Sequence, residues 1–436
     1  MIDVIAVFDI GKTNKKILLF DASFQVVSRN AIRFDELLDD DDYPCDDIAA
    51  IENWILEKIK AIQVEKKYNI KAINFSTHGA TLVYLDAEGN RIGAVYNYTK
   101  PLTGFGFSSF YEANGGVDAF SRKTASPAYG MLNTGLQMYW LKNAKPYLYQ
   151  KVKTLLHYPQ YLSYLFTKQP TADFTSIGAH TATWDFDQMK YHDWLQKESI
   201  SLPEPSHGKD AILSAVNGQD IYIGSGAHDS SASIVPLLEK NKDNEFILLS
   251  TGTWVLTMNP FSKEILTKEQ LNNNCLCFMT PEKQMVKSSM QFLGHVHEEY
   301  LRALSRYFNV EIKHHLSIQL DEDTSVAILT KNERFFLKEP IGTDFKANPD
   351  SLKQFETYQA AYYQLMFEIC EVINRSIELV LDQNNRLETI YISGGFILNT
   401  IFIDFIRKLK SEYNVRISDV KNESALGAAL LMKNYI

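Results

Sequence analysis

The feature that most constrains the fold is a pattern that the chain carries twice: a strand, a polar turn with glycine, a second strand, and then helices. The first copy has apolar runs at Val4–Phe8 and Ile17–Phe20 on either side of its turn, and the second copy has its turn at Ser250–Thr253. Two halves built in this way indicate a duplicated α/β domain. The 436 residues exceed one ordinary core, so we expect two domains, residues 1–222 and 223–436, with a ligand cleft between them.

Hydrophobic periodicity predicts the main elements of each half. In the first half we expect a third strand over roughly residues 25–34, an amphipathic helix from Ile48 to Ile62 and a buried strand at 70–75. In the second half we expect strands at 221–223, 246–249, 254–258 and 389–392, and a long helix over 360–381. The last helix begins near Glu423, and its small residues allow close packing.

Composition excludes several classes of protein. The apolar fraction of 45% and the charged fraction of 22% are those of a globular chain. The net charge of -9 argues against a nucleic-acid partner, because such binding needs clustered positive charge. No apolar run reaches the ~20 residues that cross a bilayer, and no leader precedes the first strand, so we expect a cytoplasmic protein without a membrane partner. The acidic run Asp39–Asp42, with Asp46 and Asp47 close behind, is interpreted as a solvated loop and helix start rather than a metal site.

The first turn has the composition of a phosphate-binding hairpin. Gly11 lets the backbone approach an anion, while Thr13, Asn14 and Lys16 can donate to phosphate oxygens. Asp9 has a different expected role: a carboxylate beside a polyphosphate is repelled unless a cation lies between them, so it is expected to organise hydrated magnesium. The alternative is an ordinary β-hairpin with a solvated basic turn.

Two glycine turns in the second half complete a nucleotide site in this interpretation. Gly252 and Thr253 can hold a polyphosphate, and Gly394 and Gly395 leave room for a flat base and ribose. Asn399, one turn into the following helix, can donate to the nucleoside. The alternative for the paired glycines is simple packing after a strand.

Asp229 is the candidate catalytic base. Phosphoryl transfer needs the acceptor hydroxyl in line, negative charge neutralised and a carboxylate to take the hydroxyl proton. Asp229 lies at a strand end in a glycine-flanked turn, before the helix start Ser230–Ser233. It can also cap that helix, and the two roles are not exclusive. His228 either positions the acceptor or packs structurally.

Polar residues after the buried strand at 70–75 are candidate substrate contacts. Thr77, His78 and Gly79 follow that strand, where loop residues face the cleft, and can bind sugar hydroxyls. A structural role for the histidine is equally consistent with the sequence. Asn97, at the end of the run Ala94–Tyr96, is a further polar candidate.

The ordered set of turns resembles the FGGY family of carbohydrate kinases over nearly the whole chain. Residues 9–16 resemble the first phosphate motif, Gly226–Ser230 the motif of the catalytic aspartate, Ser250–Trp254 the second phosphate motif, Ser393–Asn399 the adenosine motif and Glu423–Ala429 the closing helix. Lys12 stands where the family more often has threonine, and we count it among the phosphate-binding candidates. The resemblance implies two ribonuclease-H-like domains, as in actin, Hsp70 and the sugar kinases, and a monomeric or homodimeric enzyme that uses ATP and magnesium to phosphorylate a small sugar.

Two details of the resemblance bear on the substrate. The pair His228-Asp229 and the turn Gly252–Trp254 are nearer to the rhamnulokinase and fuculokinase branch, which implies a ketose such as L-rhamnulose or L-fuculose. The family's Trp-x-Asp-x-Arg sugar motif stands here as Tyr96–Lys100, so its sugar contacts cannot be carried over in full. An actin- or Hsp70-like ATPase and a sugar-binding pseudokinase of the same fold are the alternatives.

Overall fold

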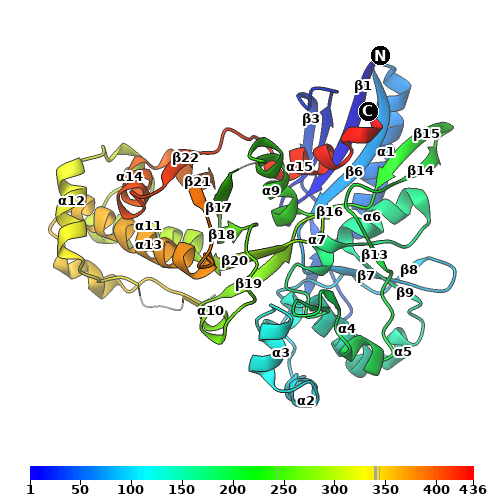
Figure 1. Ribbon diagram of the computed structural model, residues 1–436, viewed down its shortest axis with the longest axis horizontal. Helices are drawn as coiled ribbons and strands as arrows, with labels where there is room; N and C mark the ends of the chain where they lie inside the picture. The colour runs from blue at the N-terminus through cyan, green and yellow to red at the C-terminus, as the bar shows by residue number, and fades with distance from the viewer. Residues whose placement is uncertain (243, 338–340, 343) are drawn as a thin grey trace. The chain divides into compact units, whose positions relative to one another are not determined.

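The computed structural model describes residues 1–242, 244–337, 341–342 and 344–436, and internal contacts divide them into two compact units (Figure 1). Unit 1 comprises residues 1–242, 277–285 and 420–436, and unit 2 comprises residues 243–276 and 286–419. The expected boundary between residues 222 and 223 remains a prediction. The two units interleave along the sequence, because the chain returns from unit 2 to unit 1 at residues 277–285 and again at residues 420–436, which contain its last helix.

Unit 1 is built on a seven-stranded sheet with the order β14-β15-β6-β1-β2-β3, in which β16 also pairs with β6. The strands β1, β2 and β3 form the predicted antiparallel meander, and β6 runs parallel to β1. The bounds are β1 Ile2–Ile10, β2 Lys15–Phe20, β3 Val26–Ile32, β6 Tyr68–Thr77, β14 Ala211–Val216, β15 Gln219–Gly224 and β16 Ala227–His228.

Helices cover both faces of this sheet, which explains why β1 is apolar along most of its length. On one face, Phe8 and its alternate neighbours pack with α1 (Ile48–Glu65) and α6 (Tyr158–Thr167). On the other face, Val7 and its alternate neighbours pack against α15 (Glu423–Leu431). A Cβ at Gly427 would collide with the carbonyl oxygen of Ala232, so α15 lies directly on α9 (Asp229–Lys240).

Smaller elements surround the sheet of unit 1. The strands are β4 (Glu36–Leu38), β5 (Pro44–Asp46), β7 (Leu82–Leu85), β8 (Arg91–Ile92), β9 (Thr154–His157), β10 (Ala172–Asp173), β11 (Trp184–Asp185), β12 (Lys190–Tyr191) and β13 (Pro205–Ser206). The helices are α2 (Ser108–Ala113), α3 (Val117–Lys123), α4 (Thr134–Ala144), α5 (Pro146–Tyr149), α7 (Phe174–Ile177) and α8 (Trp194–Lys197).

Unit 2 repeats the strand arrangement of unit 1 on a six-stranded sheet, β19-β20-β18-β17-β21-β22. Here β17 is antiparallel to β18 and parallel to β21, as β1 is to β2 and β6. The predicted duplication is therefore confirmed in the strand pairing. The strands are β17 (Glu245–Thr251), β18 (Val255–Asn259), β19 (Cys275–Met279), β20 (Met285–Gln291), β21 (Leu387–Gly394) and β22 (Asn414–Ile417).

Unit 2 also contains the long apolar-striped helix that the sequence predicts. It is α13 (Tyr358–Val380), and its N-cap Thr357 accepts a hydrogen bond from the N–H of Ala360. The other helices are α10 (Lys268–Asn272), α11 (Leu293–Phe308), α12 (Glu322–Lys331) and α14 (Thr400–Leu409). Among the described residues, no helix is long and apolar enough to cross a membrane.

Candidate active site

The predicted phosphate hairpin is the turn between β1 and β2. The N–H of Gly11 donates to the carbonyl of Asn14 over 3.0 Å and closes the turn. Asp9 and Lys16 are register partners on the two strands, and Lys16 Nζ lies 3.1 Å from Asp9 Oδ2. Thr13 and Asn14 are exposed at the tip. The turn thus presents the exposed side chains of Thr13 and Asn14 beside one buried carboxylate, and Asn14 Oδ1 accepts from Arg33 Nε over 2.8 Å.

Asp9 is buried and has charges of both signs nearby. It is 7% exposed, and the hydroxyl of Ser424, at the start of α15, donates to its Oδ1 over 3.2 Å. Burial raises the pKa of the Asp9 carboxyl; Lys16 opposes that rise, and the negative charge of Asp229 adds to it. Asp9 and Asp229 therefore share one electrostatic environment within unit 1.

Lys12 points to a different partner from Lys16. Its Nζ lies 3.0 Å from Glu36 Oε1 and 3.6 Å from Asp46 Oδ1, both in the β4–β5 hairpin. Burial favours the neutral amine, but these carboxylates outweigh it and raise the pKa of Lys12. This pairing accounts for a lysine that the sequence left unexplained, and its phosphate role stays a prediction.

The expectation of a solvated position is wrong for Asp46, which is buried. Asp47 begins α1 as expected, with its side chain accepting from the N–H of Ala50, whereas Asp46 is buried. Its carboxylate lies 3.4 Å from Lys15 Nζ and 3.5 Å from His78 Nε2. Despite burial, His78 and the lysines hold the pKa of Asp46 well below its usual range. These partners lie about thirty residues away along the chain, so no local signal announces them.

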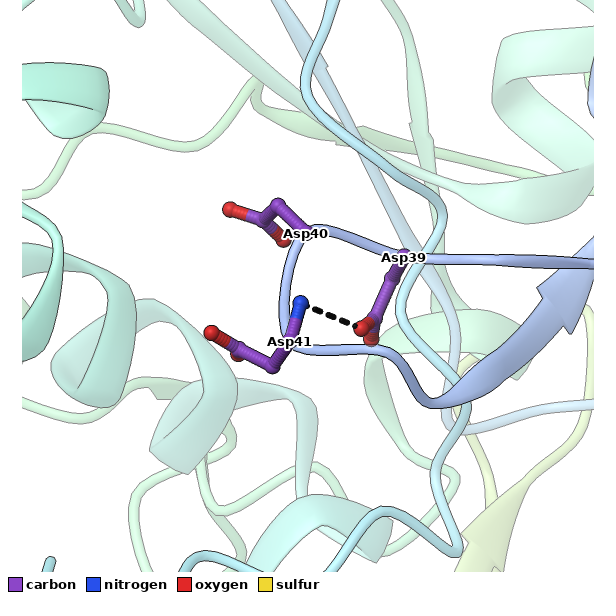
Figure 2. A group of neighbouring side chains, drawn as sticks. All are labelled: Asp39, Asp40 and Asp41. Carbon is purple, nitrogen blue, oxygen red and sulfur yellow. Dashed lines mark hydrogen bonds between the residues drawn. The ribbon is translucent and has the colours of Figure 1, made fainter.

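The acidic run folds into a turn with its carboxylates close together, as Figure 2 shows. The N–H of Asp41 donates to Asp39 Oδ1 over 2.9 Å. Lys100 Nζ lies 2.5 Å from Asp39 and 2.6 Å from Asp41, and Lys145 Nζ lies 2.6 Å from Asp40 and 2.8 Å from Asp41. The two ammonium groups offset two of the three carboxylate charges of the turn. The expectation of a solvated loop is wrong for Asp39, which is buried on Lys100.

The candidate base lies where β16 enters α9. Asp229 is the first residue of α9, its Oδ1 accepts from the N–H of Ser230 over 2.7 Å, and its side chain is 32% exposed. The N-cap position is occupied by His228, which makes no side-chain cap. Burial raises the pKa of Asp229, while the charge of His78 opposes the rise. A carboxylate with a raised pKa that still reaches solvent suits a proton acceptor.

Strand pairing brings the candidate sugar contacts to the same sheet edge as Asp9. In register, Asp9 pairs with Ser76, Ile10 with Thr77, and Thr77 in turn with His228. A Cβ at Gly79 would lie 2.9 Å from the His228 ring, so glycine is required where these segments meet. Burial, with a smaller contribution from the charge of His78, lowers the pKa of His228 to about 3 and keeps the ring neutral.

A small pocket of about 10 Å³, room for about one water molecule, lies beside these residues. Four of its lining residues, His78, Tyr158, Ser176 and His228, each have a buried polar side-chain atom with no hydrogen-bond partner. Such atoms are costly to leave dry and are normally met by a hydroxyl or by water. The full lining is Thr77, His78, Gly79, Ala80, Thr81, His157, Tyr158, Pro159, Ser176 and His228.

Asn97 is the substrate candidate with its side chain already engaged. Its Nδ2 donates to the carbonyl of Pro44 over 3.1 Å, and its Oδ1 accepts from both the N–H and the hydroxyl of Thr99. The amide therefore holds the 96–100 segment to the β4–β5 hairpin. Its predicted role at the sugar remains open.

In unit 2, the structure brings the two predicted glycine turns together. Thr251 and Gly394 are register partners on β17 and β21, and the Thr251 hydroxyl accepts from the N–H of Phe396 over 3.0 Å. Gly394 has φ of +87°, and a Cβ there would collide with the Thr251 carbonyl oxygen. A Cβ at Gly294 of α11 would likewise collide with the carbonyl oxygen of Gly252. The turn that carries Gly252 and Thr253 is thus packed backbone to backbone against its neighbours.

Asn399 has both ends of its amide in use. Its Oδ1 caps α14 by accepting from the N–H groups of Ile401 and Phe402, each over 3.1 Å. Its Nδ2 donates to the Tyr362 hydroxyl over 2.8 Å, and the same hydroxyl lies 3.1 Å from His297 Nε2. Asn399 therefore lies at the end of the adenosine-like turn, where its amide caps α14 and donates to Tyr362.

Comparison with known proteins identifies the family. Residues 4–204 match the N-terminal domain of the FGGY family of carbohydrate kinases. A rhamnulokinase from Yersinia pestis (strain Pestoides F) is 26% identical over 261 residues, which is 57% of this chain and 52% of the relative. The match over residues 4–204, together with this relative, supports the FGGY family for this chain. The alignment spans about half the length of this and other curated rhamnulokinases, such as that of Pectobacterium atrosepticum, again with 26% identity.

Solved structures share the fold of this FGGY chain over almost its whole length. A carbohydrate kinase from Novosphingobium aromaticivorans superposes with a TM-score of 0.80, at 19% identity over 100% of this chain and 92% of that one. A ligand-bound xylulose kinase from Lactobacillus acidophilus gives a TM-score of 0.81, at 16% identity over 99% and 89%. The predicted fold of two ribonuclease-H-like domains is confirmed.

Proposed function

We propose that this FGGY chain transfers the γ-phosphoryl group of ATP to a hydroxyl of a small sugar, with Asp229 as the general base. The observation that carries the proposal is the pair of carboxylates in unit 1, Asp9 and Asp229, each with a pKa raised by burial and linked through their charges. Both lie at the strand ends that also hold Thr77 and His228. Family membership is consistent with this reaction.

In the proposed reaction, Asp229 takes the proton of the acceptor hydroxyl as its oxygen bonds to the γ-phosphorus and the bond from that phosphorus to ADP breaks. The products are the sugar phosphate and ADP, and Asp229 then releases its proton to solvent through its exposed edge. The transition state is loose, so positioning and charge neutralisation are the main requirements. Lys16 supplies a positive charge at the hairpin, beside Asp9.

The proposal assigns the nucleotide to the predicted turns. In unit 1, Gly11, Lys12, Thr13, Asn14 and Lys16 hold phosphates; in unit 2, Gly252 and Thr253 hold phosphates, and Gly394, Gly395 and Asn399 face the nucleoside. Asp9 would hold magnesium through its buried carboxylate, whose Oδ2 would exchange the ammonium of Lys16 for the hydrated ion. When bound, magnesium supplies neutralisation of the polyphosphate charge.

The sugar proposal rests on the pocket beside Gly79 and on the relatives. Thr77, His78, Gly79 and His228 line the pocket, which has room for about one water, and its unpartnered polar atoms can meet one hydroxyl group of the sugar. Because the matched curated relatives are rhamnulokinases, we propose a ketose such as L-rhamnulose or L-fuculose. A binding-only pseudokinase is the second candidate, because Lys100 of the altered sugar motif is consumed by Asp39 and Asp41.

The test is ADP release from ATP and magnesium across a panel of ketoses, aldoses and polyols. We expect one ketose to stimulate turnover, and Asp229→Asn to lower that turnover at least about 1,000-fold. Asp220→Asn, at an exposed position of β15, is the matched control and should behave as the native chain. Sugar binding without ADP release would favour the pseudokinase, and turnover indifferent to every sugar would favour an ATPase.

A further inference from the structure

Asp173 is a buried carboxyl outside the motifs discussed so far. It ends the short strand β10, pairs in register with Ser206 of β13 and is 0% exposed. Its Oδ1 accepts from the N–H of Thr175 over 2.8 Å, from the Thr175 hydroxyl, and from the N–H of Ser176 over 3.3 Å. One oxygen therefore fixes the first turn of α7.

Thr175 links this carboxyl to the segment that ends at Asp229. A threonine hydroxyl has a single proton, and here it is donated to Asp173. The hydroxyl oxygen is left to accept, and it receives the N–H of His228 over 2.9 Å. The directions of both hydrogen bonds are thus set by Asp173. His228 is the last residue of β16, and the next residue is Asp229.

The surroundings leave His228 little freedom to move without carrying Asp229 with it. Its ring abuts Gly79, where a Cβ would lie 2.9 Å away. Just before it, the N–H of Gly226 donates to Asn74 Oδ1 over 3.1 Å, and a Cβ at Gly226 would lie 2.7 Å from Pro159. The His228 N–H donates to the Thr175 hydroxyl, and the ring of the same histidine lies with its Nε2 3.3 Å from Asp229 Oδ1.

We propose that Asp173 is a positioning residue for Asp229, acting through the Thr175 hydroxyl on the His228 N–H. This inference rests on the proposed role of Asp229 as the general base. The same carboxyl also orients Ser176, whose side chain lines the pocket beside His228. Burial raises the pKa of Asp173 to about 7, even though Thr175 and Ser176 favour its charged form. A plain helix cap would gain nothing from such complete burial.

The sharpest test compares Thr175→Val with Thr175→Ser. Valine has the shape of threonine but no hydroxyl, whereas serine keeps both hydrogen bonds. We expect Thr175→Val to lower kcat about 10- to 100-fold while KM for ATP stays within about twofold, and Thr175→Ser to restore kcat. Asp173→Asn keeps an acceptor oxygen without its charge and should give an intermediate kcat. Native kcat in Thr175→Val, or a fall in kcat that only follows loss of folded protein in both variants, would overturn the proposal.

Hydrogen exchange at the His228 amide separates this proposal from the proposed function. We expect that amide to exchange faster in Thr175→Val than in the native chain, and at the native rate in Thr175→Ser. This readout needs no sugar and no turnover. If the native chain shows no sugar-dependent ADP release, the proposed function fails. The exchange rates still test whether the Thr175 hydroxyl holds the His228 N–H. Unchanged exchange in Thr175→Val contradicts it.

Discussion

Lys16 donates a hydrogen bond to Asp9 Oδ2 over 3.1 Å from the facing position on the neighbouring strand. This ammonium is the counter-ion of the carboxylate that we assign to magnesium. Lys12, four residues earlier, is instead paired with Glu36 and Asp46. Two lysines of one turn therefore have different tasks, and they can be separated by substitution.

We expect Lys16→Met to raise KM for ATP about tenfold or more, because it removes a phosphate donor at the hairpin. Lys12→Met should raise KM for ATP by less, about threefold, because the ammonium of Lys12 is shared with Glu36 and Asp46 of the β4–β5 hairpin. Steady-state kinetics at saturating sugar measure both. No rise in KM for Lys12→Met would confine Lys12 to that hairpin, and no rise for Lys16→Met would remove Lys16 from the phosphate site.

Gly394→Ala should destabilise unit 2. The glycine has φ of +87°, and a Cβ would collide with the Thr251 carbonyl oxygen, so both backbone strain and a clash oppose alanine. We expect a loss of roughly 3 kcal/mol or more in the free energy of unfolding, measured by urea denaturation. At Gly395 a Cβ would lie 3.9 Å from the same oxygen, so Gly395→Ala should cost less than about 1 kcal/mol. Similar losses at both positions would argue against the clash.

Local pattern was enough to predict the central strands of the two sheets and their main helices, but not the strands β14, β16, β19, β20 and β22. The apolar run before Asp9, the turn glycines and the striped helix over 360–381 each announce their structure within a few residues. The duplication could also be predicted, because each half repeats the same order of elements. Family resemblance then supplied the expected fold, which the strand pairing bears out.

The charged interior could not be predicted in this way. Asp46 meets His78, and Asp39 meets Lys100, across separations of 32 and 61 residues that only the folded chain brings together. The sequence shows an acidic run and suggests that its side chains are exposed to solvent, whereas the folded chain places Lys100 beside the buried Asp39 and His78 beside the buried Asp46. The role of Asp173 could not be predicted for the same reason, since Asp173 acts through Thr175, whose hydroxyl accepts a hydrogen bond from the N–H of His228 in β16.

Asn399 tests whether a predicted nucleoside donor acts as one. Asparagine and aspartate both cap helices, but only asparagine donates to Tyr362. Asn399→Ala should lower the free energy of unfolding by about 1 kcal/mol through loss of the cap of α14. Asn399→Asp should keep that stability and raise KM for ATP several-fold if the amide donates to the nucleoside. An unchanged KM in Asn399→Asp would confine this residue to capping.

Lys100→Met should lower the free energy of unfolding more than the substitution of an exposed lysine does. Asp39 is buried against Lys100, and removing one partner leaves an uncompensated charge, which typically costs 3–5 kcal/mol. Urea denaturation measures the change, with Lys190→Met as control, because the pair of Lys190 with Asp193 is exposed and should contribute under about 1 kcal/mol. Recovery of the variant on addition of magnesium would reveal a metal site at Asp39–Asp41 after all.

The carboxyl of Asp173 makes stability depend on pH in a defined direction. Its pKa is raised from 3.8 to about 7 by burial, so the native state holds the proton more tightly than the unfolded chain. Between these values the native state binds more protons, and the free energy of unfolding therefore falls as pH rises, by up to about 4 kcal/mol. Above about pH 7 the loss is complete, and near pH 4 it is absent.

Asp173→Asn removes this titration. We expect the variant to gain stability relative to the native chain as pH rises from 5 to 8.5, measured by urea denaturation at each pH. The neighbouring charges are Glu282, which adds to the raised pKa and pairs with Lys209, and Lys283, which lies over the rings of Phe174 and Trp184. Glu282→Gln should therefore lower the pH at which the native chain loses stability, while Asp220→Asn should leave the pH profile unchanged. A difference between Asp173→Asn and the native chain that is the same at every pH would mean that Asp173 stays ionised in the folded protein.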